Sequence, residues 1–275
     1  MKKLTLILSL LLVFVLIFAG CSQTQTEDKE DSKYGLIDNT LLVGVDDTYP
    51  PMEYVNENGD LVGFDIEFAK ALAEEIGVEV KFVSTGWDGI FANLAAKQYD
   101  AIISSVSMTT ERMETMAFST PYLSNGQVIV ANPDMVDTIN TPEDLDGLIV
   151  GVQAETTADI AAVKLLDGGE VSFDLKDFDD MTVCLAAMEA GQIDCIVADY
   201  VVAIEAAQKN PEVFQITSAL LTNEPIAVAM NKDSEELIAA VNDAIASLRD
   251  SGKLAQISVD TLGEDYTSDI DTELR

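Results

Sequence analysis

Short apolar runs alternate with amphipathic segments along most of the chain, beginning near Leu41. Apolar runs of about 4–8 residues predict strands, and apolar residues spaced three to four apart predict helices. The first series follows the order strand, helix, strand, helix, strand, helix. Its predicted strands are 41–46, 78–84 and 101–104, and its predicted helices are 64–77, 86–98 and one that begins near 109.

The same alternation starts again after residue 140. Thr141 predicts a helix start, because it precedes a proline and two acidic residues in a capping pattern. Strands are predicted at 148–153, 171–175, 195–198 and 226–230, and helices from Thr156, over 179–190 and over 234–254. Alternating strands and helices predict parallel sheets that are covered on both faces.

The two series, with the late return to a strand and a helix, predict an α/β protein of two lobes. Lobe one is expected over 38–124 and 224–265, and lobe two over 127–220, with two crossovers between them. A cleft between α/β lobes is a preferred ligand site, particularly where strands end. The last residues, 266–275, form an acidic tail that we expect to be mobile.

The N-terminus differs from the rest of the chain. Two lysines precede the apolar stretch Leu4–Ala19, which is short for a membrane span of ~20 residues and predicts a signal peptide over 1–20. The segment Ile17–Cys21 resembles a bacterial lipoprotein cleavage box, although Phe18 stands where leucine is usual. The resemblance implies that Cys21 becomes the lipidated first residue. An uncleaved N-terminal anchor is the alternative.

Either interpretation places the protein outside the cytoplasm and holds it at a membrane. Residues 22–33 carry no apolar side chain, so we expect 21–37 to be a lipidated, disordered tether.

Composition sets further limits. The 275 residues are 48% hydrophobic and 23% charged, which is typical of a globular body. The 49 acidic and 15 basic residues give a net charge of −34, which argues against a nucleic-acid partner and favours cationic solutes over anionic ones. Adaptation of the surface to salt or pH explains the charge equally well. Since histidine is absent, we expect no metal site, and no cofactor is indicated.

Two cysteines remain in the body of the chain. Cys184 falls in a helical pattern and Cys195 in an apolar strand. Two buried thiols are the preferred interpretation, because free cysteine is often buried, although export would permit a disulfide.

The stretch ISSVSMTTER, residues 103–112, places five hydroxyl side chains and an arginine after an apolar strand. Such a polar strand end either caps the next helix or holds a ligand, and both roles are predicted here. Thr109 or Thr110 can begin a helix with Arg112 in its first turn. The planar guanidinium of Arg112 suits a bidentate contact with a carboxylate.

Six segments occur in an order that resembles the family-3 bacterial extracellular solute-binding proteins, over nearly all of 38–265. They are DDTYPPMEY, GFDIEFAKALAEEI, GWDGIFANLAAKQYDAIISSVSMTTERME, FSTPY, VGVQAETT and IDCIVADY. The resemblance implies a two-lobe venus flytrap with the type II periplasmic-binding-protein fold. It implies a monomeric receptor, not an enzyme, that binds a free L-amino acid in the cleft and delivers it to an ABC permease.

The resemblance also implies roles for the backbone groups of the ligand. Arg112 would bind the carboxylate, with donors added by Ser107 and Thr109. The residues of the second carboxylate clamp, from the opposite lobe, would be Thr156 and Thr157. The residues facing the ammonium would be Asp199 and Ser105. Plain helix capping is the alternative for the two threonines and for the aspartate.

The ligand side chain would lie between Tyr49 and Trp87, although core packing is the alternative for the tryptophan. Asp46, assisted by Ser104, would read an amine, guanidinium or amide end. Glu155 stands where the family usually has glycine, so it either points outward or favours a cationic ligand. We expect arginine, lysine or ornithine first and glutamine next, with cystine and acidic ligands less favoured.

Two other functions use the same fold. An enzyme of the cyclohexadienyl dehydratase kind would need a general acid in the cleft and a ligand without an ammonium. A sensor or adhesin could use the pocket for signalling.

Asp65 and Glu67 are interpreted as charges that favour a helix start.

Overall fold

The computed structural model describes residues 32–274 except 170 and 219. The predicted signal peptide, the lipid site at Cys21 and the tether up to residue 31 lie outside this range. Two short helices, η1 (Lys33–Gly35) and η2 (Ile37–Asn39), open the described chain. Leu36 between them is only 2% exposed, so packed structure begins before the predicted Leu41. No helix in the described part is long and apolar enough to cross a membrane.

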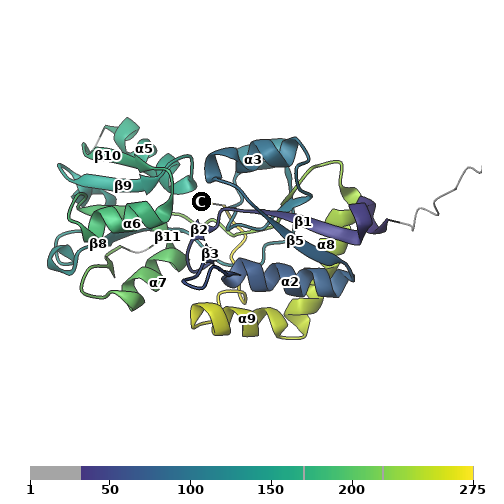
Figure 1. Ribbon diagram of the computed structural model, residues 1–275. Coiled ribbons are helices and arrows are strands. Elements are labelled where there is room, and N and C mark those ends of the chain that lie inside the picture. The colour runs from purple at the N-terminus through teal and green to yellow at the C-terminus, as the bar shows by residue number, and fades with distance from the viewer. Residues whose placement is uncertain (1–31, 170, 219, 275) are drawn as a thin grey trace, which may run out of the picture. The chain divides into compact units, whose positions relative to one another are not determined.

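Two five-stranded sheets form the centres of the two lobes (Figure 1). In the first, β1 runs parallel to β5 and β6, whereas β13 runs antiparallel to β6 and β7. In sheet order its strands are β5 (Glu79–Ser84), β1 (Thr40–Val45), β6 (Ala101–Ile102), β13 (Ala229–Met230) and β7 (Ala117–Phe118).

The second sheet repeats this design. Here β9 runs parallel to β10 and β11, whereas β8 runs antiparallel to β11 and β12. In sheet order its strands are β10 (Asp174–Phe178), β9 (Ile149–Gln153), β11 (Cys195–Asp199), β8 (Gln127–Ala131) and β12 (Gln215–Ile216). The expectation of purely parallel sheets is therefore wrong. The antiparallel strands β8 and β13 lie just beyond the two crossovers, where the chain enters a sheet from the other lobe.

Helices cover both faces of each sheet. On the first sheet, α3 (Trp87–Ala95) packs on one face and α2 (Phe64–Ile76), α8 (Glu235–Asp250) and α9 (Lys253–Leu262) on the other. On the second sheet, α5 (Thr157–Gly168) covers one face and α6 (Met181–Glu189) and α7 (Tyr200–Lys209) the other. The remaining elements are α4 (Thr110–Thr115), the small sheet of β2 (Thr48–Tyr49), β3 (Glu53–Val55) and β4 (Leu61–Val62), and the short helices η3 (Pro133–Met135) and η4 (Pro142–Leu145).

Several predicted boundaries are wrong. The helix expected over 234–254 is two helices, because Gly252 adopts the left-handed region with φ 76° and ends the first. The strand expected at 171–175 begins at Asp174 and runs to Phe178. The capping box at Thr141 forms, but it opens only the short η4.

The two lobes are joined by two crossover segments, which run side by side. The Glu224 N–H donates to Asn125 O at 3.0 Å, and the Gln127 N–H donates to Thr222 Oγ1 at 2.9 Å. A side chain at Gly126 would place its Cβ 2.2 Å from Thr222 O, so only glycine permits this close approach. The lobes are therefore connected by a narrow, hydrogen-bonded pair of chains. The exact domain bounds given above stay a prediction.

The C-terminal tail, expected to be mobile over 266–275, packs against the crossovers instead. The Ser124 N–H donates to Tyr266 O at 2.8 Å. Asn223 Nδ2 donates to Glu273 O at 2.7 Å. These bonds tie the described part of the tail to both connecting segments.

The two cysteines are buried and free, as preferred from the sequence. Cys184 on α6 packs in the cluster on one face of the second sheet, and Cys195 on β11 packs in the cluster on the other. Burial raises the pKa of each thiol to about 12. The sheet itself separates the two sulfur atoms.

Replacing Gly44 with Ala is expected to destabilise lobe one by about 1–3 kcal/mol, because overpacking a closed core forces neighbours to move. The added Cβ would lie 2.4 Å from the ring carbon Cζ of Tyr99, which is itself buried and donates its hydroxyl proton to Ile90 O. Urea unfolding monitored by circular dichroism measures the change. Gly168→Ala is the matched control, since no atom lies within 4 Å of its added Cβ. Equal stability of the two variants would contradict the packing.

Candidate functional site

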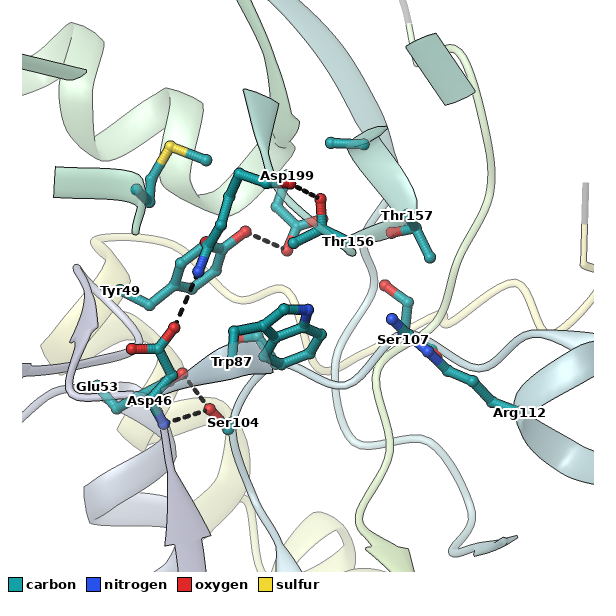
Figure 2. Close-up of a pocket in the computed structure, with 14 residues that line it drawn as sticks. Asp46, Tyr49, Glu53, Trp87, Ser104, Ser107, Arg112, Thr156, Thr157 and Asp199 are labelled. Carbon is teal, nitrogen blue, oxygen red and sulfur yellow. Dashed lines mark hydrogen bonds between the residues drawn. The ribbon is translucent and has the colours of Figure 1, made fainter. Parts of the chain in front are cut away.

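A cavity between the lobes brings together almost all of the predicted ligand-binding residues (Figure 2). Trp87 lies between Asp46 and Arg112 in this view. The lining residues are Asp46, Tyr49, Glu53, Trp87, Ser104, Ser105, Ser107, Arg112, Gln153, Thr156, Thr157, Ala158, Met181 and Asp199. Thr109 is the one predicted contact that does not line the cavity. Its hydroxyl accepts the N–H of Arg112 at 3.1 Å and caps α4.

Arg112 has no carboxylate partner among residues 32–274 as the structure describes them. Its Nη1 donates to Ser107 O at 3.0 Å, and its guanidinium carbon lies 5.5 Å from the ring centre of Trp87 and 4.9 Å from that of Phe91. None of the ion pairs found in the described chain includes it. Burial lowers the pKa of Arg112, and the charge of Glu224 opposes that shift. A half-buried guanidinium in this position lacks an anion.

The start of α5 faces Arg112 from the other lobe. The Thr156 hydroxyl caps the helix by accepting the N–H of Asp159 at 3.3 Å, and it donates to Gln153 O at 2.7 Å. Thr157 is buried, and its hydroxyl accepts from Gln127 Nε2 at 3.0 Å. The capping interpretation is therefore correct for Thr156, and the same helix start also lines the cavity. Helix N-termini stabilise anions, so a carboxylate between the lobes could meet donors from both.

Asp199 is held by side chains and does not cap α7. Its Oδ2 accepts from the Tyr49 hydroxyl at 2.7 Å, and its Oδ1 accepts from Asn125 Nδ2 and Gln127 Nε2, both at 2.7 Å. Burial raises the pKa of Asp199, and these donors oppose that shift by stabilising the ionised form. The helix-cap alternative is wrong because no backbone N–H of α7 bonds to this carboxylate.

Asp65 lies in the first turn of α2, as interpreted from the sequence, but its carboxylate also supports the site. It is fully buried, and its Oδ2 accepts the Ser105 N–H at 2.6 Å while its Oδ1 accepts the Tyr122 hydroxyl at 2.8 Å. Ser105 has a positive φ of 47°, which is uncommon for a residue with a side chain. Asp65 thus fixes the strained turn that carries Ser105 into the cavity. Glu67, in contrast, is exposed and pairs with Lys70.

Asp46 is also held from both lobes. Its Oδ1 accepts from the Thr48 hydroxyl at 2.7 Å, and its Oδ2 accepts from Gln153 Nε2 at 2.9 Å. Ser104 links Asp46 to a second acid, Glu53, because its hydroxyl accepts the Asp46 N–H at 2.9 Å and donates to Glu53 Oε1 at 2.6 Å. The proposed side-chain end of the cavity therefore contains two carboxyls.

Trp87 contributes to both packing and closure. Its ring meets Phe91 edge-on with centres 5.1 Å apart, and its Nε1 donates across the cleft to Glu155 O at 3.1 Å. The Glu155 side chain is exposed, and its backbone has a positive φ of 60°. Of the two alternatives for Glu155, the structure has the outward-pointing one. Its carbonyl, not its carboxylate, takes part in the site.

Four polar residues of the site were not predicted: Glu53, Asn125, Gln127 and Gln153. Glu53 lies within the segment DDTYPPMEY, and Gln153 within VGVQAETT, so both stood in segments that carry the resemblance. Each of the four has one buried oxygen without a hydrogen-bond donor in the described chain. Glu53 and Gln153 line the cavity, whereas Asn125 and Gln127 contact it through their hydrogen bonds to Asp199.

Comparisons with known proteins agree with this arrangement. A family model of bacterial extracellular solute-binding proteins, family 3, matches residues 41–264. The chain is 35% identical over 228 residues to the L-cystine-binding protein TcyJ of Escherichia coli (strain K12), covering 83% of this chain and 84% of that protein.

Solved structures show the same likeness. The arginine-bound form of truncated ArgBP from T. maritima matches with a TM-score of 0.71 and 38% identity, over 77% of this chain and 97% of that one. An ancestral arginine-binding protein matches at 34% identity, with a TM-score of 0.77 in its arginine-bound structure and 0.76 in its glutamine-bound structure. The match to the arginine-bound structure covers 82% of this chain and 99% of that one.

The two-lobe fold, the site at the lobe boundary and the match over 41–264 lead to one conclusion. The chain belongs to the bacterial extracellular solute-binding proteins, family 3.

Proposed function

We propose that the chain is an extracytoplasmic receptor that delivers a polar, cationic L-amino acid to an ABC importer. Arginine, lysine and ornithine are the favoured ligands. The receptor acts as a monomer and is held at the membrane by a lipid on Cys21. One observation carries the proposal of an amino acid: a guanidinium without an anion, Arg112, and a carboxylate without a cation, Asp199, line the same cavity.

A free amino acid supplies both missing charges. Buried charges need partners, so the ligand carboxylate would pair with Arg112 and the start of α5, and the ammonium with Asp199 and Ser105. The donors from Asn125 and Gln127 favour the ionised form of Asp199, which an ammonium requires.

The far end of the cavity supports a cationic side chain. Asp46 and Glu53 lie there with no lysine or arginine paired to either in the described chain. Trp87 would stack on the ligand's guanidinium or aliphatic part, and stacking on a guanidinium contributes about 0.5–2 kcal/mol. Two of the similar structures have arginine as the bound ligand, which agrees with a cationic side-chain end.

Two other amino acids have specific support. The glutamine-bound ancestral structure favours a neutral amide end, which Gln153 and the Asp46 carboxylate could also hydrogen-bond. The likeness to a cystine-binding protein favours cystine, whose second ammonium would meet the same acids.

An enzyme of the dehydratase kind has one supporting observation. Burial raises the pKa of Glu53 well above its usual range, as a general acid requires. However, a prephenate-like acid brings two carboxylates and no ammonium. Asp46 and Asp199 would oppose it, so the receptor is the better-supported function.

A thermal-shift screen with single amino acids tests the proposal. A ligand at about 100 times its Kd stabilises the native state by about 2.7 kcal/mol, and we expect a rise in Tm of roughly 5–10 °C for arginine, lysine or ornithine. Stabilisation by prephenate alone would contradict the receptor function.

The variant Asp46→Asn sharpens the screen, since it keeps the shape and removes one charge at the side-chain end. We expect the shift with arginine to shrink and the shift with glutamine to remain. If both shifts stay unchanged, Asp46 does not read the ligand side chain.

A further inference from the structure

Three carboxyls lie close together beside the side-chain end of the cavity, which Asp46 and Glu53 line and Asp65 does not. Asp46 follows β1, Glu53 lies on β3 and Asp65 on α2, and they are 4%, 1% and 0% exposed. None of them forms an ion pair with a lysine or arginine of the described chain. Neighbouring buried carboxyls cannot all remain ionised, because like charges in a poorly solvated site repel.

The three carboxyls differ in the hydrogen bonds that they accept. Asp46 accepts three donors, from Gln153 Nε2 and from the hydroxyl and N–H of Thr48. Asp65 also accepts three, from the Tyr122 hydroxyl and from the N–H and hydroxyl of Ser105. Such donors stabilise an ionised carboxylate.

Glu53 differs from its two neighbours. It accepts a single hydrogen bond, from the Ser104 hydroxyl at 2.6 Å, and its buried Oε2 receives none. A proton on this carboxyl can instead be donated to the Asp65 carboxylate. Burial raises the pKa of Asp65 to about 6, and a hydrogen bond from Glu53 opposes that shift, whereas the same bond adds to the rise that burial causes in the pKa of Glu53. A proton shared by the three carboxyls is therefore expected on Glu53, because Glu53 accepts one hydrogen bond whereas Asp46 and Asp65 each accept three.

The groups that face Glu53 leave it without a positive charge. Asp65 approaches from α2, Asp46 from the end of β1 and Tyr49 from β2. Tyr122 approaches from the segment after β7 and Ser104 from the end of β6. Desolvation is the largest cause of its raised pKa, followed by the charge of Asp65. Arg112, the cation among the residues that line the cavity, bonds to Ser107 at the opposite end.

We propose that Glu53 holds a proton in the unliganded receptor and releases it to solvent when a cationic side-chain end binds beside it. The proposal rests on the function proposed above. The pocket thereby changes character with its ligand: a cationic end meets an ionised Glu53, whereas a neutral end leaves the proton in place. Glu53 then helps to set specificity through its protonation state.

Isothermal titration calorimetry of the full chain with arginine and citrulline tests the proposal, because citrulline has nearly the shape of arginine and no side-chain charge. Between pH 6 and pH 8, linkage predicts that arginine affinity rises with pH by up to about tenfold per unit while Glu53 is protonated in the free protein. Citrulline affinity should stay constant. At one pH, titrations in phosphate and in Tris should show a proton released with arginine and none with citrulline.

Two variants assign the proton. Glu53→Gln should weaken arginine binding and abolish its pH dependence, and Asp46→Asn should weaken arginine binding but keep the proton release. The measurement of proton release in phosphate and in Tris uses the unmodified chain, so it tests the proposal even if neither variant folds.

The outcomes separate the two proposals. Arginine binding without proton release and without pH dependence overturns the role of Glu53 but leaves the receptor function intact. Binding of neutral amino acids only overturns both the role of Glu53 and the cationic ligand proposed above, and leaves a receptor for neutral amino acids. If no amino acid binds, the receptor function fails, and the role of Glu53 fails with it.

Discussion

Replacing Arg112 with Ala is expected to raise the Kd for the amino acid by roughly two to four orders of magnitude. Removing one partner of a buried, hydrogen-bonded charge pair costs about 3–5 kcal/mol, because the other charge is left buried without a partner. Here the stranded group would be the ligand carboxylate. Calorimetric titration with the strongest ligand from the screen measures the loss.

Arg112→Lys is the matched control. It keeps the charge but loses the planar fork, so an intermediate loss is expected. The melting temperature without ligand should hardly fall in either variant, since Arg112 forms no ion pair and donates one hydrogen bond to Ser107 O. Wild-type affinity in Arg112→Ala would show that the carboxylate binds elsewhere.

Replacing Asp199 with Asn should weaken binding by roughly 100-fold, because a hydrogen bond to a charged group is worth about 1.5–3 kcal/mol. The substitution preserves shape, and the new amide oxygen can still accept from Asn125 and Gln127. The loss therefore reports the missing negative charge opposite the ligand ammonium. Calorimetric titration again gives the Kd.

A ligand without the ammonium provides the control for this variant. The 2-hydroxy analogue of arginine should bind weakly to the unmodified receptor and no worse to Asp199→Asn. Tyr49→Phe removes only the phenol that donates to Asp199 Oδ2, and it should cost less than the loss of the charge. An equal loss of both ligands in Asp199→Asn would mean that Asp199 acts on the fold and not on the ammonium.

The fold was largely predictable because the hydrophobic pattern reports burial. Strands such as β8 and β11 are buried at every position and lie between two layers of helices, so they read as continuous apolar runs. The pattern does not report strand direction, so the antiparallel direction of β13 was missed, and β8 was not predicted as a strand. It also passes unbroken through Gly252, where a left-handed residue divides one expected helix into two.

The site was predictable where its residues lie close together in the sequence. Ser104, Ser105 and Ser107 lie on the loop before α4 and Arg112 in its first turn, and all four line the cavity. Asn125 and Gln127 escaped notice because they reach Asp199 from 74 and 72 residues away. The polar network of the crossovers depends on tertiary contacts that no local pattern contains.

The bond from Trp87 to the opposite lobe has a practical consequence. Trp87 is the only tryptophan of the chain, and its indole nitrogen donates to Glu155 O across the cleft. Excitation at wavelengths that only tryptophan absorbs therefore excites a single fluorophore, and this fluorophore lies at the lobe boundary. Separation of the lobes would break its only hydrogen bond to the other lobe and expose the ring to water. Stopped-flow fluorescence can therefore follow opening and closing of the unlabelled receptor.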